Sequence, residues 1–363
     1  MTETPIRVGF IGLNPDSHWA ATAHLPALKS LGDTYEITGV ANSTLESAKR
    51  TAEALGLKHA FDTPADLVAS PDIDLVVVTV KVPYHFELVS TALNAGKHVY
   101  CEWPLGNGLD EARRLAELAA EKGVVAVAGT QARTALEILH LKQLIEDGFV
   151  GEVLSTSLIG SGGNWSDKTI EEYYYLFDSN NGATMQSIPM AHTLAAVQDV
   201  LGNFGTLDVR FLNRFKTVEV TDAGGESRPK TAPDQLMVHG TMESGAAVSI
   251  HYRGGVSRGT NLLWEINGSE GDIQVTADLG HAQMVQLTVK GARGEDKELT
   301  NLMPAPELYK GKPEFAGARN VAGIYARLAE DIRTGSQSAP SFAEAVALHD
   351  LLDRIERSAA AKG

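Results

Sequence analysis

The chain has 363 residues, enough for two domains with separate cores, and 43% of them are hydrophobic, which is ordinary for a globular protein. Its 46 acidic and 31 basic residues give a net charge of −15, which argues against a nucleic-acid-binding surface, and no run of about 20 apolar residues could span a bilayer. The N-terminus lacks a basic region followed by a long apolar stretch, so we expect a cytoplasmic protein.

The first third of the chain alternates strands and helices. Apolar strands are predicted at 6–11, 37–41, 75–80, 98–101 and 124–128, with helical patterns between them. The third of these runs is almost continuous in Val and Leu, as expected for a strand buried on both faces. The alternation predicts an α/β fold, with a doubly wound parallel sheet forming a Rossmann-type dinucleotide-binding domain over 1–132.

After Gln131 the pattern changes. A helix is predicted over 134–147, and alternating strands follow at 236–242, 246–252, 262–267, 273–275 and 284–289. These strands fit an α+β domain with an open, mostly antiparallel sheet over 133–320, and the polar segment 222–233 predicts a loop or hairpin tip. Helical patterns close the chain, and we expect the C-terminal helix, 340–363, to pack back on the first domain.

The first strand runs into a segment that only partly matches a dinucleotide-binding turn. Such a turn has three glycines, and here Gly12 fills the first place while Asn14 and Ser17 hold the second and third. Asn tolerates left-handed backbone geometry and Ser is small, so phosphate binding at the following helix N-terminus stays feasible. On this motif alone, an ordinary strand–turn–helix is the simpler interpretation.

The second strand ends without the acidic residue that NAD-specific sites use to bind the ribose hydroxyls. Asn42 and Ser43 stand there instead, and a neutral side chain does not repel a 2′-phosphate. The cofactor is therefore expected to be NADP or NAD, with NADP slightly favoured and Lys49 or Arg50 as candidate partners. Alternatively, Ser43 and the next residue simply cap a helix, because 43–46 has capping-box spacing.

Two later stretches are specific to a known family. They are Val78-Thr79-Val80-Lys81-Val82-Pro83-Tyr84-His85 and the segment 95–102. With them the chain resembles the glucose–fructose oxidoreductase / inositol dehydrogenase family over essentially its whole length. Within that family it is most similar to the branch that contains a fungal galactose-regulon repressor, which binds the dinucleotide but acts by contacting a transcriptional activator. The features shared with that branch are Lys81-Val82-Pro83, Glu102-Trp103, Gln131 with Arg133, Gly162-Gly163 followed by a tryptophan, and Gly182 with His192-Thr193.

The resemblance implies roles for the matching residues. Gly12 should meet the pyrophosphate, and Glu102 should touch the nicotinamide ribose. The residues implied at the rest of the cofactor site are Val80, Pro83, His85 and Gln131. Arg133 lies beside Gln131 and is a candidate substrate contact. The resemblance also implies a homodimer or homotetramer assembled through the C-terminal sheet.

Trp103 stands where the family carries its catalytic lysine, and Ile188 stands where an aspartate often precedes the family's histidine. A tryptophan cannot share a proton with a reacting alcohol. We expect its flat face to form a wall against the nicotinamide or the sugar, and the alternative is an ordinary core aromatic. Lys81 could supply the lost charge or could pair with Glu102, and both interpretations stay open.

His192 matches the family's substrate-facing histidine and is the candidate for the hydroxyl proton, although a lone histidine in apolar company is more often a core residue. Tyr174 is a candidate proton donor, with simple packing as the alternative. Trp165 is a candidate for stacking on a sugar. No histidine has metal-ligand spacing, so we expect no metal site. The only cysteine, Cys101, is expected to be a core residue.

Together these features favour an NAD(P)-dependent oxidoreductase that acts on a small-molecule sugar or sugar derivative by hydride transfer. The loss of the lysine keeps a second interpretation open, a non-catalytic dinucleotide-binding sensor. A third is glycoside cleavage through transient oxidation by bound NAD, which some members of the resembled family perform. The sequence names neither the sugar nor the direction of the reaction.

Overall fold

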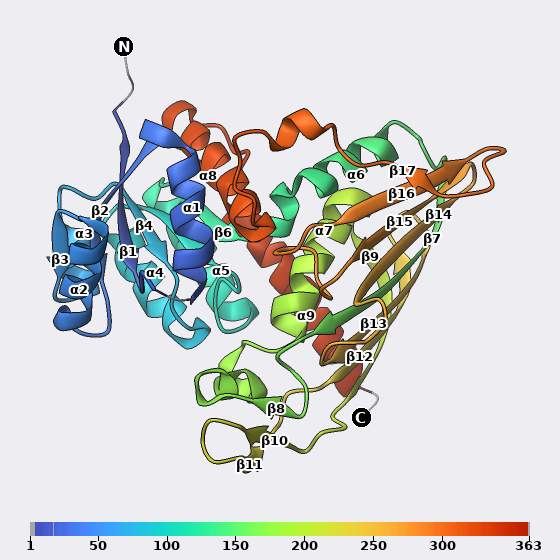
Figure 1. Cartoon of the computed structure of the whole chain (residues 1–363), viewed down its shortest axis with the longest axis horizontal. Helices are drawn as coiled ribbons and strands as arrows, with labels where there is room; N and C mark the ends of the chain where they lie inside the picture. Colours follow the sequence, from blue (N-terminus) through green and yellow to red (C-terminus); the bar gives the residue numbers. More distant parts are fainter. Residues whose placement is uncertain (1–3, 17, 362–363) are drawn as a thin grey trace. The chain divides into compact units, whose positions relative to one another are not determined.

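The structure is a computed structural model that describes residues 4–16 and 18–361. The chain divides into two compact units. Unit 1 comprises Met1–Gln131 with Gly311–His349, and unit 2 comprises Ala132–Lys310 with Asp350–Gly363. Figure 1 labels the elements of both.

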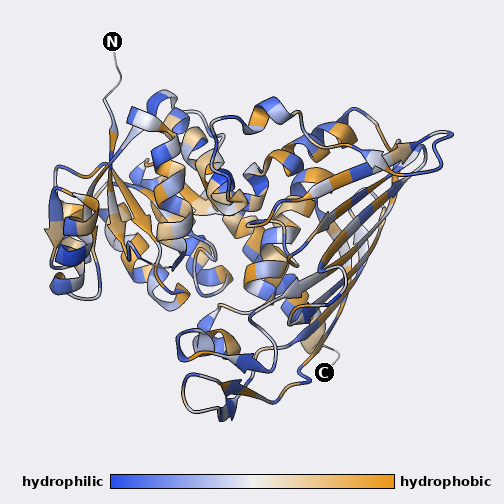
Figure 2. Cartoon of the chain, viewed as in Figure 1, coloured by the Kyte–Doolittle hydropathy of each residue, from blue (hydrophilic) through white to orange (hydrophobic). Residues whose placement is uncertain are grey.

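Unit 1 contains a six-stranded parallel sheet with the strand order β3-β2-β1-β4-β5-β6. Its strands are β1 (Ile6–Ile11), β2 (Tyr35–Ala41), β3 (His59–Phe61), β4 (Leu75–Val78), β5 (His98–Glu102) and β6 (Ala126–Gly129). This is the order of a dinucleotide-binding Rossmann fold, with the direction of winding reversing between β1 and β4, and it confirms the predicted parallel sheet. β4 is buried along its whole length, as its apolar run predicted, and Figure 2 shows the apolar strands within the unit.

Helices flank this sheet. They are α1 (Leu25–Ser30), α2 (Leu45–Leu55), α3 (Pro64–Ala69), α4 (His85–Asn94), α5 (Leu109–Lys122) and α8 (Ala316–Thr334). The helix predicted after β1 begins differently, because a π-helical turn, Ala20–His24, precedes α1. α2 is capped by Thr44, whose hydroxyl accepts a hydrogen bond from the Ser47 amide at 3.2 Å. Thr44 is one of the two residues expected to cap this helix, whereas the capping-box register over 43–46 is wrong by one residue.

The segment after α8 returns to the edge of this sheet. The Ala128 amide donates to the Pro340 carbonyl at 2.9 Å, and Val127 forms an antiparallel bridge with Ser341. The carboxylate of Asp331 holds this return segment by accepting hydrogen bonds from its backbone amides. The segment therefore covers part of the outer edge of β6.

The last helix, α9 (Phe342–Ala360), belongs to both units. Its residues up to His349 group with unit 1, whereas the sequence assigned the whole helix to the first domain. The remainder is held in unit 2, where the Arg354 guanidinium donates to the Phe204 carbonyl at 3.1 Å and the Gln186 amide donates to the Leu352 carbonyl at 3.2 Å.

Unit 2 is built on an eight-stranded sheet with the order β17-β16-β15-β14-β7-β13-β12-β9. Its strands are β7 (Val153–Gly162), β9 (Phe204–Leu212), β12 (Gln235–Met242), β13 (Ala247–Gly254), β14 (Leu262–Gly268), β15 (Gly271–Ala277), β16 (Thr288–Arg293) and β17 (Thr300–Asn301). The neighbours β7 and β13 run parallel and the other neighbouring pairs run antiparallel, which confirms the open, mostly antiparallel sheet. The helices α6 (Leu136–Glu146) and α7 (Ala191–Leu201) lie on one side of it (Figure 1).

Two details of unit 2 differ from the sequence prediction. The strand predicted at 284–289 forms later, as β16, because the loop before it is tied down. In that loop the Ala282 amide donates to the Thr193 hydroxyl at 3.2 Å, and the Gly280 carbonyl accepts from the Ser161 amide at 3.1 Å. The polar segment 222–233 holds part of a hairpin, β10 (Thr217–Val220) with β11 (Glu226–Pro229), which forms a small sheet with β8 (Lys168–Thr169).

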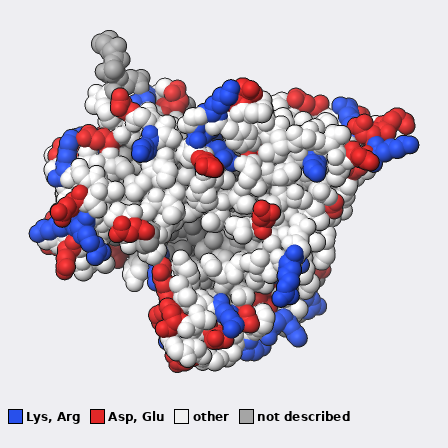
Figure 3. Space-filling view, in the orientation of Figure 1, with Lys and Arg blue, Asp and Glu red and all other residues white. Residues whose placement is uncertain are grey.

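The acidic excess does not gather into a single cluster on the face shown in Figure 3, where side chains of both signs are interspersed. None of the described helices combines the length and the apolar character that a bilayer crossing requires.

Candidate dinucleotide and substrate sites

The turn after β1 is shaped by Gly12. Its φ of +98° lies in the region that glycine favours, and a Cβ at this position would stand 2.6 Å from Cγ1 of Val80. The hydroxyl of Thr79 donates to the Gly12 carbonyl at 2.8 Å. The ends of β1 and β4 therefore meet closely where the winding of the sheet reverses, which is where doubly wound folds bind their ligands. A backbone without a side chain at this point fits the close approach of a pyrophosphate.

Asn42 supports this turn from the end of β2. Its Oδ1 accepts from the Leu13 amide at 3.0 Å, and its Nδ2 donates to the Leu13 carbonyl at 2.9 Å. The hydroxyl of Thr51 donates to the same carbonyl at 3.1 Å. The amide of Asn42 is thus committed to the turn, while Ser43 beside it is exposed.

Asn14, the second predicted position of the turn, makes its described hydrogen bond within the loop. Oδ1 of Asn14 accepts from the Asp16 amide at 3.0 Å, so this side chain stabilises the loop itself. The positive φ that the sequence allowed at Asn14 is found at His18, at 72°. Ser17, the third position of the motif, lies outside the described residues.

His85, the first residue of α4, is buried and bridges two loops. Its Nδ1 lies 2.7 Å from the Pro104 carbonyl oxygen and its Nε2 lies 2.9 Å from the Val80 carbonyl oxygen. Burial lowers the pKa of this imidazole. His85 thus ties the end of β4 to the turn after β5, whereas Lys81 and Pro83 are exposed.

Glu102 ends β5 at the same carboxyl edge of the sheet, with its side chain 12% exposed. Its Oε1 lies 3.0 Å from Nε2 of His24, and Nε2 of Gln131 donates to its Oε2 at 3.5 Å. The described contacts of this carboxylate include His24 and Gln131. The sequence did not single out His24.

Trp103 is 5% exposed, and its ring packs against that of His349, with the centroids 4.5 Å apart and the planes at 42°. This packing within unit 1 favours the core interpretation of the tryptophan over an open wall. Cys101 is fully buried as expected, and burial together with the neighbouring Glu102 charge raises the pKa of its thiol well above the ordinary value.

The buried His349 predicts an acid sensitivity. Burial lowers its pKa to about 3, and its Nε2 has no hydrogen-bond partner. An imidazole with a lower pKa in the folded state takes up its proton on unfolding. Its contribution to stability is therefore present above pH ~6.5 and is lost as the pH falls towards the folded pKa. The loss in unfolding free energy reaches about 2 kcal/mol at pH 5.

Replacing His349 with leucine should therefore reduce the drop in unfolding free energy between pH 7.5 and pH 5 by about 2 kcal/mol, measured by urea unfolding. The matched control is His239→Leu on the exposed side of β12, which should leave the pH dependence unchanged. An unaltered pH dependence in His349→Leu would show that another group causes the acid loss.

In unit 2 two buried imidazoles, those of His192 and His281, each have a ring nitrogen without a hydrogen-bond partner. His192, in the first turn of α7, is 2% exposed and its Nδ1 has no hydrogen-bond partner. Burial, with a smaller effect of the His281 charge, lowers its pKa well below 6.5. Burial also lowers the pKa of His281 to about 4, and Nδ1 of His281 is likewise buried without a partner.

No motif in the sequence marks His281 as a candidate site residue. It lies in the loop between β15 and β16, which the hydrogen bond from Ala282 to Thr193 fixes against α7. Only the folded chain brings this loop to His192, and both imidazoles are neutral at physiological pH.

Arg133 also supports α7, through an ion pair with Asp199. The guanidinium is buried and its Nε has no hydrogen-bond partner. The sequence expected a substrate contact here, and the structure adds this bond to α7, the helix that carries His192.

The remaining candidates have packing roles. The indole N–H of Trp165 donates to the Leu176 carbonyl at 3.1 Å, and a Cβ at Gly162 would stand 2.7 Å from its ring. The hydroxyl of Tyr174 donates to the Pro229 carbonyl at 2.8 Å, and the Arg228 guanidinium lies 5.2 Å from its ring centroid. These contacts correspond to the packing alternative that the sequence left open for Tyr174.

Comparisons with known proteins agree with this geometry. Residues 6–130 match the model of the oxidoreductase family with an NAD-binding Rossmann fold, and residues 137–277 match that of the C-terminal domain of Gal80p. The galactose/lactose metabolism regulatory protein GAL80 of Saccharomyces cerevisiae is 31% identical over 341 residues, covering 88% of this chain and 78% of that protein. The chain belongs to the NAD-binding oxidoreductase family, in its Gal80-like branch.

Other relatives of this Gal80-like protein differ in their stated roles. The dehydrogenase aclE of Aspergillus oryzae is 33% identical, covering 74% of this chain and 76% of that one. The crystal structure of a super-repressor mutant of Gal80p from S. cerevisiae has a TM-score of 0.90 at 27% identity, covering 99% of this chain and 97% of that one. Levoglucosan dehydrogenase in complex with NADH and L-sorbose has a TM-score of 0.84 at 19% identity, covering 99% of this chain and 97% of that one, which shows a shared fold alone.

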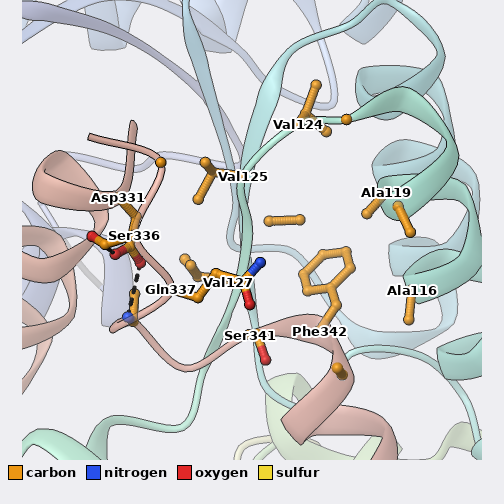
Figure 4. A pocket seen from close by; sticks show the side chains of 16 residues that line it. Ala116, Ala119, Val124, Val125, Val127, Asp331, Ser336, Gln337, Ser341 and Phe342 are labelled. Carbon is orange, nitrogen blue, oxygen red and sulfur yellow. Dashed lines mark hydrogen bonds between the residues drawn. The ribbon is translucent and has the colours of Figure 1, made fainter. Parts of the chain in front are cut away.

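A cavity of 540 Å³ in unit 1 lies away from these residues of the Gal80-like chain. It is enclosed by α5, β6 and the return segment 335–343, with Phe342, Val124 and Val125 among its lining residues (Figure 4). Its lining includes Ala126 at the amino end of β6, whereas Gly12, Val80 and Glu102 mark the carboxyl ends of the other strands. Among the described residues, no group of three or more His, Cys, Asp or Glu side chains is arranged to hold a metal ion.

Proposed function

We propose that this protein binds a nicotinamide dinucleotide at the carboxyl edge of the unit 1 sheet and uses it to oxidise or reduce a sugar or sugar derivative. The cradle at Gly12, where a side chain would collide with Val80, supports pyrophosphate binding at this edge. The family match over 6–130 supports the same class of ligand. When bound, the dinucleotide would supply hydride acceptance or donation at the nicotinamide ring.

The observation that carries the catalytic part of the proposal is the unpartnered Nδ1 of His192. A buried polar atom without a hydrogen bond costs about 1–3 kcal/mol, so such an atom is expected to serve a ligand. Because the lowered pKa keeps the imidazole neutral, His192 can accept the proton of a substrate hydroxyl. His281, also neutral, would lie beside it as a second contact for the sugar.

A second candidate function is a dinucleotide-binding regulator without turnover. Trp103 favours it, because the residue cannot replace the catalytic lysine expected at its position. The similarity to a regulatory protein of galactose and lactose metabolism favours it as well. The preference for NADP over NAD is also a proposal, supported by the absence of a carboxylate at the end of β2, where Asn42 and the exposed Ser43 stand.

Titration with NADH and NADPH, followed by nicotinamide fluorescence, tests the binding part. Gly12→Ala should weaken affinity by tenfold or more, because the added Cβ would stand where the pyrophosphate approaches the backbone and would collide with Val80, so that the turn must shift. Gly96→Ala is the matched control, since Gly96 has a φ of +72° in open space.

Absorbance at the nicotinamide band against a panel of sugars then separates the two functions. Turnover of any sugar establishes the oxidoreductase. Tight dinucleotide binding without turnover establishes the regulator. Absence of binding to both dinucleotides by the wild-type protein would reject both candidates.

A further inference from the structure

We infer that His24, backed by Tyr325, is a positioning residue that fixes the Glu102 carboxylate for a vicinal diol of the ligand, such as a ribose. The inference rests on the proposed dinucleotide binding. It assigns a role to a buried histidine that the sequence motifs do not reveal.

The hydrogen bonds of His24 determine which ring nitrogen carries the proton. Nε2 lies 3.0 Å from Oε1 of Glu102, and Nδ1 lies 2.8 Å from the hydroxyl oxygen of Tyr325. A carboxylate only accepts, so Nε2 carries the hydrogen towards Glu102, and Nδ1 accepts the hydrogen of the phenol. Burial holds the pKa of Tyr325 well above its ordinary value, which keeps this phenol a donor.

The hydrogen-bonded chain Tyr325–His24–Glu102 is held in place by three separate elements. His24 ends the π-helical turn, Tyr325 lies on α8, and Glu102 ends β5. The hydroxyl of Tyr35 donates to the main-chain oxygen of Tyr325 at 2.7 Å. The ring of Tyr100 stacks on Tyr325 with the centroids 5.0 Å apart, and it meets His24 edge-on at 5.1 Å. Because His24 is fully buried in this aromatic cluster, its ring has little freedom to turn.

The space around Glu102 is equally specific. A Cβ at Gly129, on the neighbouring strand β6, would lie 2.6 Å from Oε1 of Glu102, so only glycine leaves room for the carboxylate there. Nε2 of His24 contacts Oε1, and Nε2 of Gln131 donates to Oε2 over the longer distance of 3.5 Å. The side chain of Glu102 is 12% exposed, and we expect Oε2 to accept hydrogen bonds from ligand hydroxyls at the carboxyl edge of the sheet.

The test compares two replacements of His24. His24→Leu removes the donor and should weaken NADH binding by about 10- to 100-fold, as expected for the loss of a charge-assisted hydrogen bond that orients the carboxylate. His24→Gln carries an amide N–H close to the position of Nε2 and should keep affinity within about threefold of wild type. Tyr325→Phe removes one oxygen at small cost in packing and should weaken binding by about three- to tenfold.

A double-mutant cycle separates this role from simple folding support. Glu102→Gln should lose about as much affinity as His24→Leu. The double variant should lose little more than either single variant, because both changes remove the same His24–Glu102 interaction. His59→Leu is the matched control, because it removes a histidine–carboxylate contact of the same length, 3.0 Å from Nε2 to Oδ2 of Asp72, outside this aromatic cluster, and it should bind like wild type.

The outcomes are distinct. If the wild-type protein binds NADH but His24→Leu and Tyr325→Phe bind equally well, the positioning role is rejected and dinucleotide binding stands. Additive losses in the cycle also reject it. If the wild-type protein binds neither NADH nor NADPH, the proposed function fails and this inference fails with it.

Discussion

Replacement of His192 with asparagine should lower sugar turnover by about 10²- to 10⁴-fold, the range expected for removal of a general base. Dinucleotide affinity should stay within about twofold of wild type, because the role proposed for His192 is to accept the proton of the substrate hydroxyl and not to bind the dinucleotide. Initial rates on a sugar that the wild-type protein converts, together with NADH fluorescence titration, provide the measurement.

The control for His192→Asn is His251→Asn. His251 lies on the exposed side of β13, where its Nε2 is 3.1 Å from Oε1 of Gln235, and its loss should leave turnover unchanged. Full activity in His192→Asn would remove this histidine from the mechanism. Because burial keeps the imidazole neutral, the acid limb of kcat should fall well below the usual histidine pKa of ~6.5.

Replacement of Lys230 with methionine should destabilise the protein by about 3–5 kcal/mol at pH 7. The side chains of Lys230 and Asp234 are fully buried, and the ammonium donates to the Asp234 carboxylate at 2.9 Å, to Oδ1 of Asn213 at 2.9 Å and to the Ala232 carbonyl at 2.6 Å. Without the Lys230 ammonium, the buried Asp234 carboxylate has lost the positive charge that it pairs with. Equilibrium unfolding in urea measures the change.

The exposed pair of Lys58 and Glu36 provides the control, since Lys58→Met should cost less than about 1 kcal/mol. A loss of similar size in both variants would show that the buried pair contributes no more than a surface pair.

The pH dependence of the Lys230→Met effect has a definite sign. Burial raises the pKa of Asp234, but hydrogen bonds from the Phe215 amide, from Lys230 and from the Arg214 amide outweigh it and hold that pKa below its usual value. The stability that Asp234 contributes is therefore present above pH ~3.9 and is lost as the pH falls through its folded pKa. In Lys230→Met the unpaired Asp234 carboxylate can become neutral by taking up a proton. The loss of unfolding free energy relative to wild type should therefore be smaller at pH 4 than at pH 7.

The sequence predicted the parallel sheet well because the signal is local. The run that became β4 is apolar at every position, and a strand buried on both faces has that composition. Gly12 was likewise identifiable, since the backbone it must adopt is a property of the turn itself. By contrast, no local sequence pattern predicts the three-residue β3 or the π-helical turn at Ala20–His24.

The site was less predictable because it depends on pairings between distant residues. His24 meets Glu102 only in the folded chain, because 78 residues separate the two, and His281 reaches α7 only through the loop that Thr193 holds. Asn42 shows a further difficulty. An amide at the end of β2 can serve a ligand or the neighbouring backbone, and only the folded turn shows that it bonds to Leu13.

The pairing of β6 with the return segment has a consequence for biosynthesis. The backbone partner of Ala128 is Pro340, roughly 210 residues later, so a ribosome adding about 5–20 residues per second exposes that strand for about 10–40 seconds before its partner is made. Throughout this interval the nascent chain presents an open edge to other chains. A product truncated before Pro340 would keep that edge permanently, which makes premature termination a direct route to aggregation.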